Sequence, residues 1–482
     1  MPLPLHLFDG QSPGSVVFHG GDGFFYHKVN SRPNRKFTYL RCVHRNNKAL
    51  MCLGSAKALL GQGLLYSLHG HSHPSNSLYP LMKALKRDII LRVKLGDQTA
   101  FHEIVQQEGQ KYPPEVRVLV PIGSIQSRLH AIRSALRPPL PRNLGVLGAY
   151  LLLPEYQYLT QCLHVPESCF AGMCGSLPEK TLSLVFITPE MKTFMQTRST
   201  VFADGTERKL FRKPKASQIF QIVTVWRFHT IPMLKAIMLR RSENAYIVLF
   251  EYIKALMPQF SPTAVKCDFE EAQVNAWRIC FPGASVEGCL WHFDCAVFRH
   301  TKIKLGLYNF LKENEEASSI VRSAGALPLL PTHEIINGLY DLGWEAVNKG
   351  LMMELRPFFN YMEKEWVPKV PVLSVKGSMH RTNNACESAN RSLNKEIKVA
   401  NPNCFHVVRA LVMTNDRAAY DMKVLANPGT GAPGRGRKLS VLRNDAVIKR
   451  LTTDLEMGDI SRLEFLHKSS RRLQNVFNKY FD

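Results

Sequence analysis

The sequence predicts an α/β protein with a mixed-sheet domain in the middle of the chain, preceded by a small β-rich unit and a set of helices. Three observations predict this class. Apolar strand patterns begin near residue 181 and then alternate with helical patterns. Aromatic-rich strand patterns with glycine-rich turns lie between residues 16 and 74, and helical spacing follows over residues 75–140. At 482 residues the chain is long enough for roughly two to four domains.

The charge favours a polyanionic partner. Lys and Arg number 62 against 39 Asp and Glu, a formal net charge of +23. We expect nucleic acid, although ribosomal and membrane-surface proteins share such a balance. The longest apolar run, residues 144–153, is shorter than the ~18 residues of a spanning helix, and Asp9 interrupts any signal-peptide core, so we expect a soluble intracellular protein. The 11 Cys form no dense cluster in the sequence, which favours reduced thiols or zinc over disulfides.

The first 74 residues contain four side chains that suit a structural zinc site, namely Cys42, Cys52, His71 and His73. Two thiolates and two imidazoles form closed tetrahedral sites, and a sheet this small would take most of its folding free energy from the metal. His69 alternates with the other two His, so the spacing does not say which two imidazoles bind. The alternative is that two unrelated Cys precede a His-rich loop.

This segment resembles a FLYWCH-type zinc finger. The resemblance rests on Tyr39-Leu40-Arg41-Cys42, on Cys52 and on His71-Ser72-His73-Pro74, and Leu40 stands where the family has Trp. It implies that the unit holds zinc and binds DNA. Phosphate contacts are then expected from the basic residues of the segment, Lys28, Arg32, Arg35, Lys36, Arg41 and Arg45.

Residues 75–140 have helical patterns. Met82, Leu85, Ile89 and Val93 recur at helical spacing with basic residues between them, so this apolar stripe is expected to face a core. Basic residues around the prolines at 138–141 indicate a linker.

Strands come first in the next region, and helices then alternate with strands. The strands cover 182–188, 199–203, 219–226 and 233–238, followed by a helix at 243–257, a strand at 263–265, a helix at 270–280 and a strand at 285–291. This order resembles an RNase H-like fold, in which one acid lies on the first long strand and another at the end of the neighbouring fourth strand. Asp204 and Asp268 occupy those positions.

Two acids at strand ends suggest phosphoryl-transfer chemistry. Adjacent strands stand roughly 4.8 Å apart, so Asp204 and Asp268 can share metal ions. Two divalent ions roughly 3.5 to 4 Å apart serve in-line attack on a phosphodiester, and oxygen ligands select Mg²⁺ or Mn²⁺. Glu387 is the candidate third carboxylate, because apolar residues recur every four positions over 385–397 and mark a buried face that leaves Glu387 on another. The alternative is a capping box in which Glu387 bonds the backbone of Asn384.

From about residue 115 to 415 the chain resembles a Mutator-like element (MULE) transposase. The motifs are Phe202-Ala203-Asp204-Gly205-Thr206, Asp268-Phe269-Glu270, Phe281-Pro282, Gly288-Cys289-x-x-His292-Phe293, Phe358-Phe359-Asn360-Tyr361 ahead of Trp366, and Arg381-Thr382-Asn383-Asn384-x-x-Glu387. The resemblance implies a DDE triad of Asp204, Asp268 and Glu387 that cleaves and transfers DNA strands, with a helical insertion before the Glu. Two departures are Glu207, where the family has Phe, and Ser-Ala-Asn after Glu387 in place of Gly-Trp-His. A domesticated copy acting as a DNA-binding regulator is the alternative.

Cys289 and His292 form a Cys-x-x-His pair at a predicted strand end. The spacing fits two of four zinc ligands, and it also fits a buried thiol beside a hydrogen-bonded imidazole. The MULE resemblance implies a position near the active site. We therefore take both as candidate site residues without assigning a metal to them.

The C-terminal region is basic. Residues 429–438 are expected to track phosphates, to act as a nuclear-import signal or to form a solvated loop, and a basic amphipathic helix is expected over about 462–479. By analogy with transposases, we expect a nuclear protein without a membrane partner that forms a homo-oligomer on transposon-end and target DNA. The predicted domains are a zinc finger at 1–74, a helical linker domain at 75–180, an RNase H-like core at 181–300, a helical insertion at 301–375, a segment with the third acid at 376–425 and a basic segment at 426–482.

Overall fold

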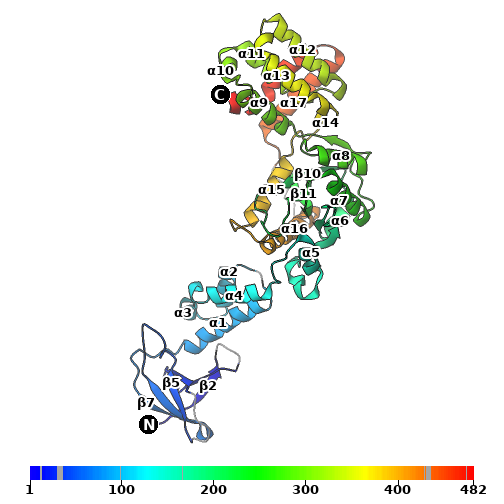
Figure 1. Ribbon diagram of the computed structural model, residues 1–482. Coiled ribbons are helices and arrows are strands. Elements are labelled where there is room, and N and C mark those ends of the chain that lie inside the picture. Colours follow the sequence, from blue (N-terminus) through cyan, green and yellow to red (C-terminus); the bar gives the residue numbers. More distant parts are fainter. Residues whose placement is uncertain are drawn as a thin grey trace. The chain divides into compact units, whose positions relative to one another are not determined.

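The computed structural model describes residues 1–482 except 11–13, 30–35, 98, 165–166, 428, 430–435, 474 and 482. The chain forms two compact units, Met1–Pro139 and Leu140–Asp482, each with a seven-stranded sheet and helices of its own (Figure 1). The predicted α/β class is therefore confirmed. Among the described residues, no helix is both long and apolar enough to cross a bilayer.

The sheet of the first unit is antiparallel, in the order β1-β7-β6-β5-β4-β3-β2. Its strands are β1 (Leu3–Pro4), β2 (His6–Asp9), β3 (Val16–His19), β4 (Phe25–Lys28), β5 (Thr38–Cys42), β6 (Ser55–Leu59) and β7 (Leu64–His69). Tyr26, Leu40 and Ala56 belong to a small core on this sheet. Gly21 and Gly23 follow β3 with φ of 78° and 80°, a conformation that glycine adopts without steric cost.

The helices of the first unit have a core of their own. They are α1 (Tyr79–Lys94), α2 (Phe101–Gly109), α3 (Pro114–Val118) and α4 (Gln126–Leu136). Leu85, Ile89 and Val93 of the predicted stripe are buried against residues such as Ile104 and Leu129, and Met82 packs at the edge of this cluster. The predicted apolar face of α1 is thus confirmed.

The sheet of the second unit is mixed, in the order β14-β13-β10-β11-β12-β9-β8. Its strands are β8 (Phe170–Cys174), β9 (Ser183–Phe186), β10 (Thr200–Thr206), β11 (Gln218–Trp226), β12 (His229–Met238), β13 (Ala264–Lys266) and β14 (Ser285–Glu287). β10, β13 and β14 run parallel, and the remaining pairs are antiparallel. The prediction of a strand over 285–291 was wrong in extent. The backbone N–H of Gly288 donates to the carbonyl of Val372 (2.7 Å) in place of a neighbouring strand, and a helix starts at Leu290.

Helices cover both faces of this sheet. They are α5 (Leu144–Leu152), α6 (Pro189–Gln196), α7 (Glu243–Leu256), α8 (Glu271–Cys280), α15 (Asn384–Glu396) and α16 (Cys404–Ala426). Phe220 of β11 contacts the Tyr246 ring of α7, whereas the next residue, Gln221, hydrogen-bonds Asn390 of α15. Successive strand residues point to opposite faces, so α7 and α15 cover opposite sides of the sheet.

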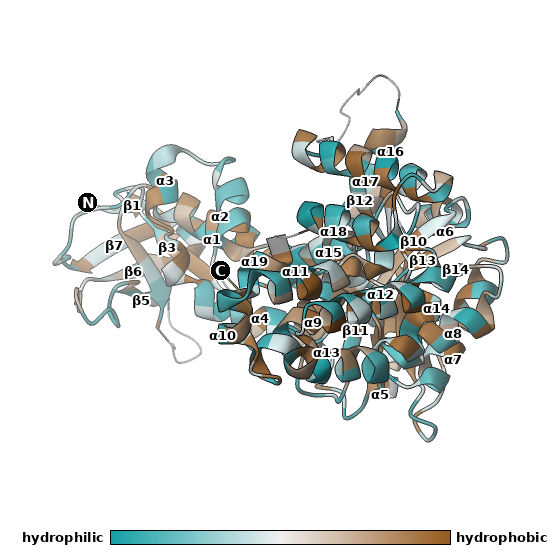
Figure 2. Cartoon of the chain, turned by 90° about the horizontal axis from the view of Figure 1, so that it is seen from above, coloured by the Kyte–Doolittle hydropathy of each residue, from teal (hydrophilic) through white to brown (hydrophobic). Residues whose placement is uncertain are grey.

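The remaining helices form a second core beside the sheet. They are α9 (Leu290–Ile303), α10 (Tyr308–Glu313), α11 (Glu315–Ala324), α12 (Ile335–Asn348), α13 (Met352–Glu365), α14 (Val370–Leu373), α17 (Leu439–Met457), α18 (Arg462–Leu473) and α19 (Asn475–Phe481). Phe298, Phe358, Leu466 and Phe477 are among its buried residues, so the predicted C-terminal amphipathic segment packs its apolar side here. The helices carry hydrophilic as well as hydrophobic residues (Figure 2), as expected of helices with one packed face.

Candidate functional site

Asp204 lies on the α15 side of the second sheet. It is partly buried in β10 directly opposite Gln221 of β11. The backbone N–H of Gly205 donates to its Oδ1 (2.7 Å), and the side-chain amide of Asn390 donates to its Oδ2 (2.8 Å). Asn390 in turn accepts a hydrogen bond from Gln221 (2.5 Å), so a chain of amides fixes the carboxylate. Burial and the negative charge of Asp268 raise the pKa of Asp204 to about 7.

Asp268 lies at the same end of the neighbouring strand. Phe202 of β10 is paired in parallel with Lys266 of β13, and the two acids each follow two residues later. Cys267, between Lys266 and Asp268, still donates its backbone N–H to the carbonyl of Glu287 (3.1 Å). The carboxylates of Asp204 and Asp268 therefore leave adjacent parallel strands at one edge of the sheet.

Glu387 comes from the first turn of α15. The buried side of this helix includes Ala385, Cys386 and Ala389, which pack against strand residues such as Phe202. The residue before the helix is Asn383, and it makes no side-chain cap hydrogen bond. Because Asn384 is the first helical residue and not the cap, the capping-box alternative for Glu387 is not formed, and the carboxylate is one-third exposed at 33 %.

His292 lies between two of the acids. Its Nδ1 is 2.6 Å from Oδ1 of Asp268, and its Nε2 is 3.9 Å from Oε1 of Glu387. Burial disfavours the charged imidazolium, but the neighbouring Asp268 and Cys289 outweigh it and raise the pKa of His292 to about 11. Asp268, Cys289 and His292 each offer one ligand atom, and these atoms lie within 4.8 Å of one another. The structure thus brings the Cys-x-x-His pair to the acids.

A basic cavity opens next to Glu387. It has a volume of about 430 Å³ and is lined by Arg208, Lys209, Glu387, Asn390, Arg391, Asn394 and Lys395. The sequence interpretation missed its four cations. The signal was present, since Arg391 and Lys395 follow Glu387 at four and eight residues and so share its face of the helix. Guanidinium and ammonium groups beside carboxylates suit a phosphate backbone that approaches the acids.

Glu207, the extra acid near Asp204, forms an ion pair with an arginine. Its carboxylate pairs with Arg241 (2.6 Å), which also pairs with Glu270 (2.8 Å). The extra acid is therefore paired with a cation that it shares with Glu270.

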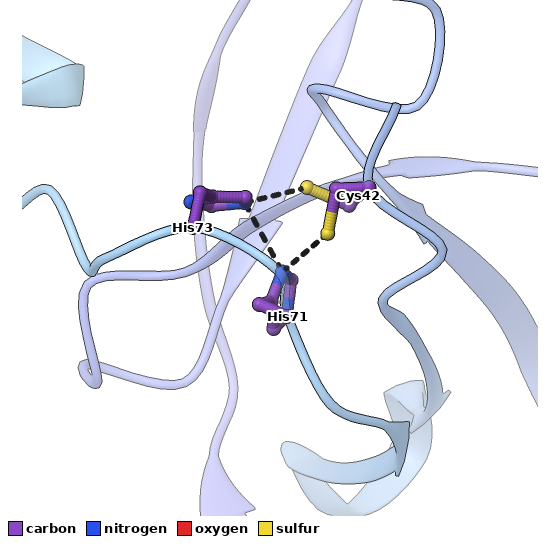
Figure 3. A group of neighbouring side chains, drawn as sticks. Cys42, His71 and His73 are labelled. Carbon is purple, nitrogen blue, oxygen red and sulfur yellow. Dashed lines mark hydrogen bonds between the residues drawn. The ribbon is translucent and has the colours of Figure 1, made fainter. Parts of the chain in front are cut away.

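A second metal-binding arrangement lies in the first unit. Cys42, Cys52, His71 and His73 bring one ligand atom each within 4.8 Å of one another, so they could hold a metal ion. Figure 3 shows the two imidazoles and the sulfur of Cys42 pointing toward a common point. The separations are 3.2 Å for Cys42–His73, 3.5 Å for Cys52–His71 and 3.3 Å for His71–His73. A tetrahedral ion with zinc bond lengths needs S–N edges of ~3.5 Å and N–N edges of ~3.3 Å, so the cluster has the size of such a site.

Outer hydrogen bonds orient these ligands. Tyr26 lies 2.9 Å from Nε2 of His71, and the carbonyl of Pro74 lies 2.8 Å from Nδ1 of His73. His69, which the spacing could not exclude, instead pairs with the hydroxyl of Ser55 (2.7 Å). Metal-binding imidazoles commonly have such a partner at the second ring nitrogen.

The basic residues proposed for phosphate contact lie in part within the described chain. Lys28, Lys36, Arg41 and Arg45 are exposed, whereas Arg32 and Arg35 lie outside the described residues. Most of the basic stretch at 429–438 also lies outside them, and within it Arg437 forms an ion pair with Asp445.

No protein-family model and no curated protein matches the chain.

Proposed function

We propose that this chain is a DNA transposase of the MULE type, which cleaves and transfers DNA strands by a metal-dependent DDE mechanism. The observation that carries the proposal is that Asp204 and Asp268 follow the ends of adjacent parallel strands, while Glu387 of a distant helix lies across His292 from Asp268 and lines a basic cavity. The strand order β12-β11-β10-β13-β14, with the last two strands parallel to β10, supports an RNase H-like core.

The acids suit a hard divalent cation. Asp204 and Asp268 repel one another strongly enough to contribute to the raised pKa of Asp204, and an ion between them would relieve that repulsion. Asp204, Asp268 and Glu387 would hold Mg²⁺ or Mn²⁺, which when bound activates the attacking oxygen and stabilises the leaving oxygen. The protein's own contribution is orientation, since Gly205 and Asn390 hold the carboxylate of Asp204 in place.

The cavity cations supply the substrate contact in this proposal. Arg208 and Lys209 follow the strand that carries Asp204, and Arg391 and Lys395 lie along the helix that carries Glu387. Phosphates held between these two groups would run beside the acids. This arrangement supports DNA over a small metabolite, because four cations around an open cavity favour a ligand with several negative charges.

The first unit acts as a zinc finger that binds DNA in this proposal. Zinc, held by Cys42, Cys52, His71 and His73, would stabilise a sheet whose own core is small. The exposed Lys28, Lys36, Arg41 and Arg45 would contact phosphates and make binding dependent on salt. A nuclear location and a homo-oligomer that holds two DNA ends are parts of the same proposal.

A strand-transfer assay tests the proposal. The flanks of the gene are first searched for terminal inverted repeats, and the substrate is DNA that ends in the repeats found there, with Mg²⁺ or Mn²⁺ present. We expect product from the wild type, none from Asp204→Asn or Asp268→Ala, and wild-type product from Glu207→Gln, whose carboxylate pairs with Arg241. Equally little product from the wild type and Asp268→Ala, with DNA binding intact in both, would instead support a domesticated DNA-binding regulator.

A further inference from the structure

We propose that Cys289, His292 and Asp268 bind a thiophilic divalent ion of the zinc class, in addition to the hard cation assigned to the three acids. The proposed function gives Asp268 a role in catalysis, and this inference adds that the same side chain is shared with a second ion. Ion binding by the three side chains does not itself depend on strand transfer.

Backbone geometry places these ligands together. β13 and β14 are parallel neighbours, so Asp268 and Cys289 follow the same ends of two adjacent strands. Cys289 is the residue before α9, and His292 lies three residues later in the first turn of that helix. Residues three apart on a helix lie on one side, which turns both side chains toward Asp268.

The sulfur of Cys289 has surroundings similar to those of the two sulfurs of the first cluster. Cys289 is 2 % exposed, and the backbone N–H of Asn383 donates to its Sγ (3.2 Å). The proposed zinc ligands of the first unit receive the same kind of bond, from His44 to Cys42 (3.3 Å) and from Gly54 to Cys52 (3.3 Å). The sulfur atoms of both clusters thus accept a hydrogen bond from a backbone amide.

The other two ligand atoms point at each other. Oδ1 of Asp268 and Nδ1 of His292 are buried and lie 2.6 Å apart, and among the described residues no third group bonds either atom. In the metal-free chain they form an ion pair, and a cation between them would take the place of the imidazole proton. A tetrahedral ion needs an O–N separation of ~3.3 Å, so binding would move the two atoms apart by ~0.7 Å.

The donor set decides the class of ion. One thiolate, one imidazole and one carboxylate select Zn²⁺ or Co²⁺ over Mg²⁺, which prefers oxygen ligands. Three protein ligands leave a fourth position for water, the arrangement of an open zinc site. Glu387 faces the opposite nitrogen of His292, so it stays available to the hard cation.

Metal content and cobalt spectra of the full chain test the inference. Zn²⁺ is counted by plasma mass spectrometry after dialysis, and Co²⁺ is then titrated into the metal-free protein to record the sulfur-to-cobalt absorption. We expect Cys289→Ala to lose one equivalent of metal and its share of the absorption. Cys386→Ala is the matched control, because its thiol is equally buried nearby but lies outside the cluster, and it should keep the full content.

A second variant replaces the first if the first does not fold. If Cys289→Ala unfolds by circular dichroism, His292→Asn removes a ligand at similar volume and should also lose one equivalent. Unchanged metal content and cobalt absorption in a folded Cys289→Ala or His292→Asn would overturn the inference. Loss of the equivalent from a chain whose wild type transfers no strands would leave the inference standing and remove the proposed transposase function alone.

Discussion

A buried lysine in the second sheet allows the stability of this unit to be tested against pH. Lys235 of β12 is 0 % exposed, and its Nζ donates to the side-chain oxygen of Asn415 on α16 (2.5 Å). Among the described residues it forms no ion pair with a carboxylate, and the titratable group that faces it is the thiol of Cys169. Burial lowers the pKa of Lys235 from 10.5 to about 7.

The sign of the pH effect follows from proton counting. Between about pH 7 and 10.5 the unfolded chain binds a proton at this lysine that the folded chain does not, so the wild type gains stability as pH rises through that window. Below pH 7 the cost of burying the charge is fully present. The difference between the pKa of 10.5 in the unfolded chain and about 7 in the folded chain corresponds to ~5 kcal/mol of unfolding free energy, and ~2 kcal/mol of this cost remains at pH 9.

Lys235→Met should therefore stabilise the protein in acid. The lost hydrogen bond leaves the oxygen of Asn415 without its donor, which costs ~1–3 kcal/mol, so we expect a net gain of ~2–4 kcal/mol at pH 6. The advantage over wild type should shrink by ~2–3 kcal/mol on going to pH 9. Urea unfolding of both proteins at the two pH values measures it. The contributions of the other titrating groups cancel in the difference between the two unfolding free energies, because both proteins contain these groups.

A matched lysine gives the opposite expectation. Lys266 of β13 is also buried, but it pairs with Glu287 and hydrogen-bonds Ser378 (2.8 Å). Lys266→Met would leave a partly buried carboxylate without its cation, so it should destabilise the unit by ~3 kcal/mol or more. If Lys235→Met were destabilising at pH 6, or its effect did not change by pH 9, the reasoning about an uncompensated buried charge would be refuted.

Three further predictions concern the metal cluster of the first unit, the cavity and the glycine that ends β14. Cys52→Ser should lose the metal equivalent of the first unit while His69→Ala keeps it, as counted by mass spectrometry, because His69 bonds a serine and not the cluster. Arg391→Ala should weaken DNA binding for every sequence tested and reduce the slope of log affinity against log salt by ~1, as measured by fluorescence anisotropy. Gly288→Ala should lower the unfolding free energy by ~1–3 kcal/mol, because its Cβ would meet an aromatic ring carbon at 2.2 Å, whereas Gly283→Ala, with nothing within 4 Å, should be neutral in thermal melts.

The spacing of apolar residues along the sequence predicted which face of a helix is buried. The face of α15 predicted to be buried, from residues recurring every four positions, is buried, and it lies against the sheet. The prediction of a strand over 285–291 was wrong in extent, because the apolar residues at its end are compatible with a strand or a helix. The strand ends where Gly288 bonds Val372, a residue distant in sequence. Lys235 lay inside the predicted strand at 233–238, but no local signal shows that it is fully buried, since α16 provides its hydrogen-bond partner.

The candidate site was predicted less completely, because ligand choice depends on contacts between distant segments. Spacing left three His open for the first cluster, and only the fold shows that His69 pairs with Ser55 while His71 and His73 converge. The position of His292 between Asp268 and Glu387 could not be read from a Cys-x-x-His pair alone.

The way the chain leaves and re-enters the sheet explains how Glu387 reaches two acids so distant in sequence. The chain leaves the sheet after Gly288 and returns to it at α15, and these two points are joined at the site. The N–H of Leu290 donates to the carbonyl of Arg381 (3.0 Å), and the N–H of Asn383 donates to the sulfur of Cys289 (3.2 Å). Glu387 lies one helical turn after these two hydrogen bonds. They fix its position, whatever the length of the chain between Leu290 and Arg381. Cys289 is therefore a candidate metal ligand and also the hydrogen-bond acceptor at the start of α15. A substitution of Cys289 can change metal content directly and can change strand transfer through the position of Glu387, so both must be measured on the same variant.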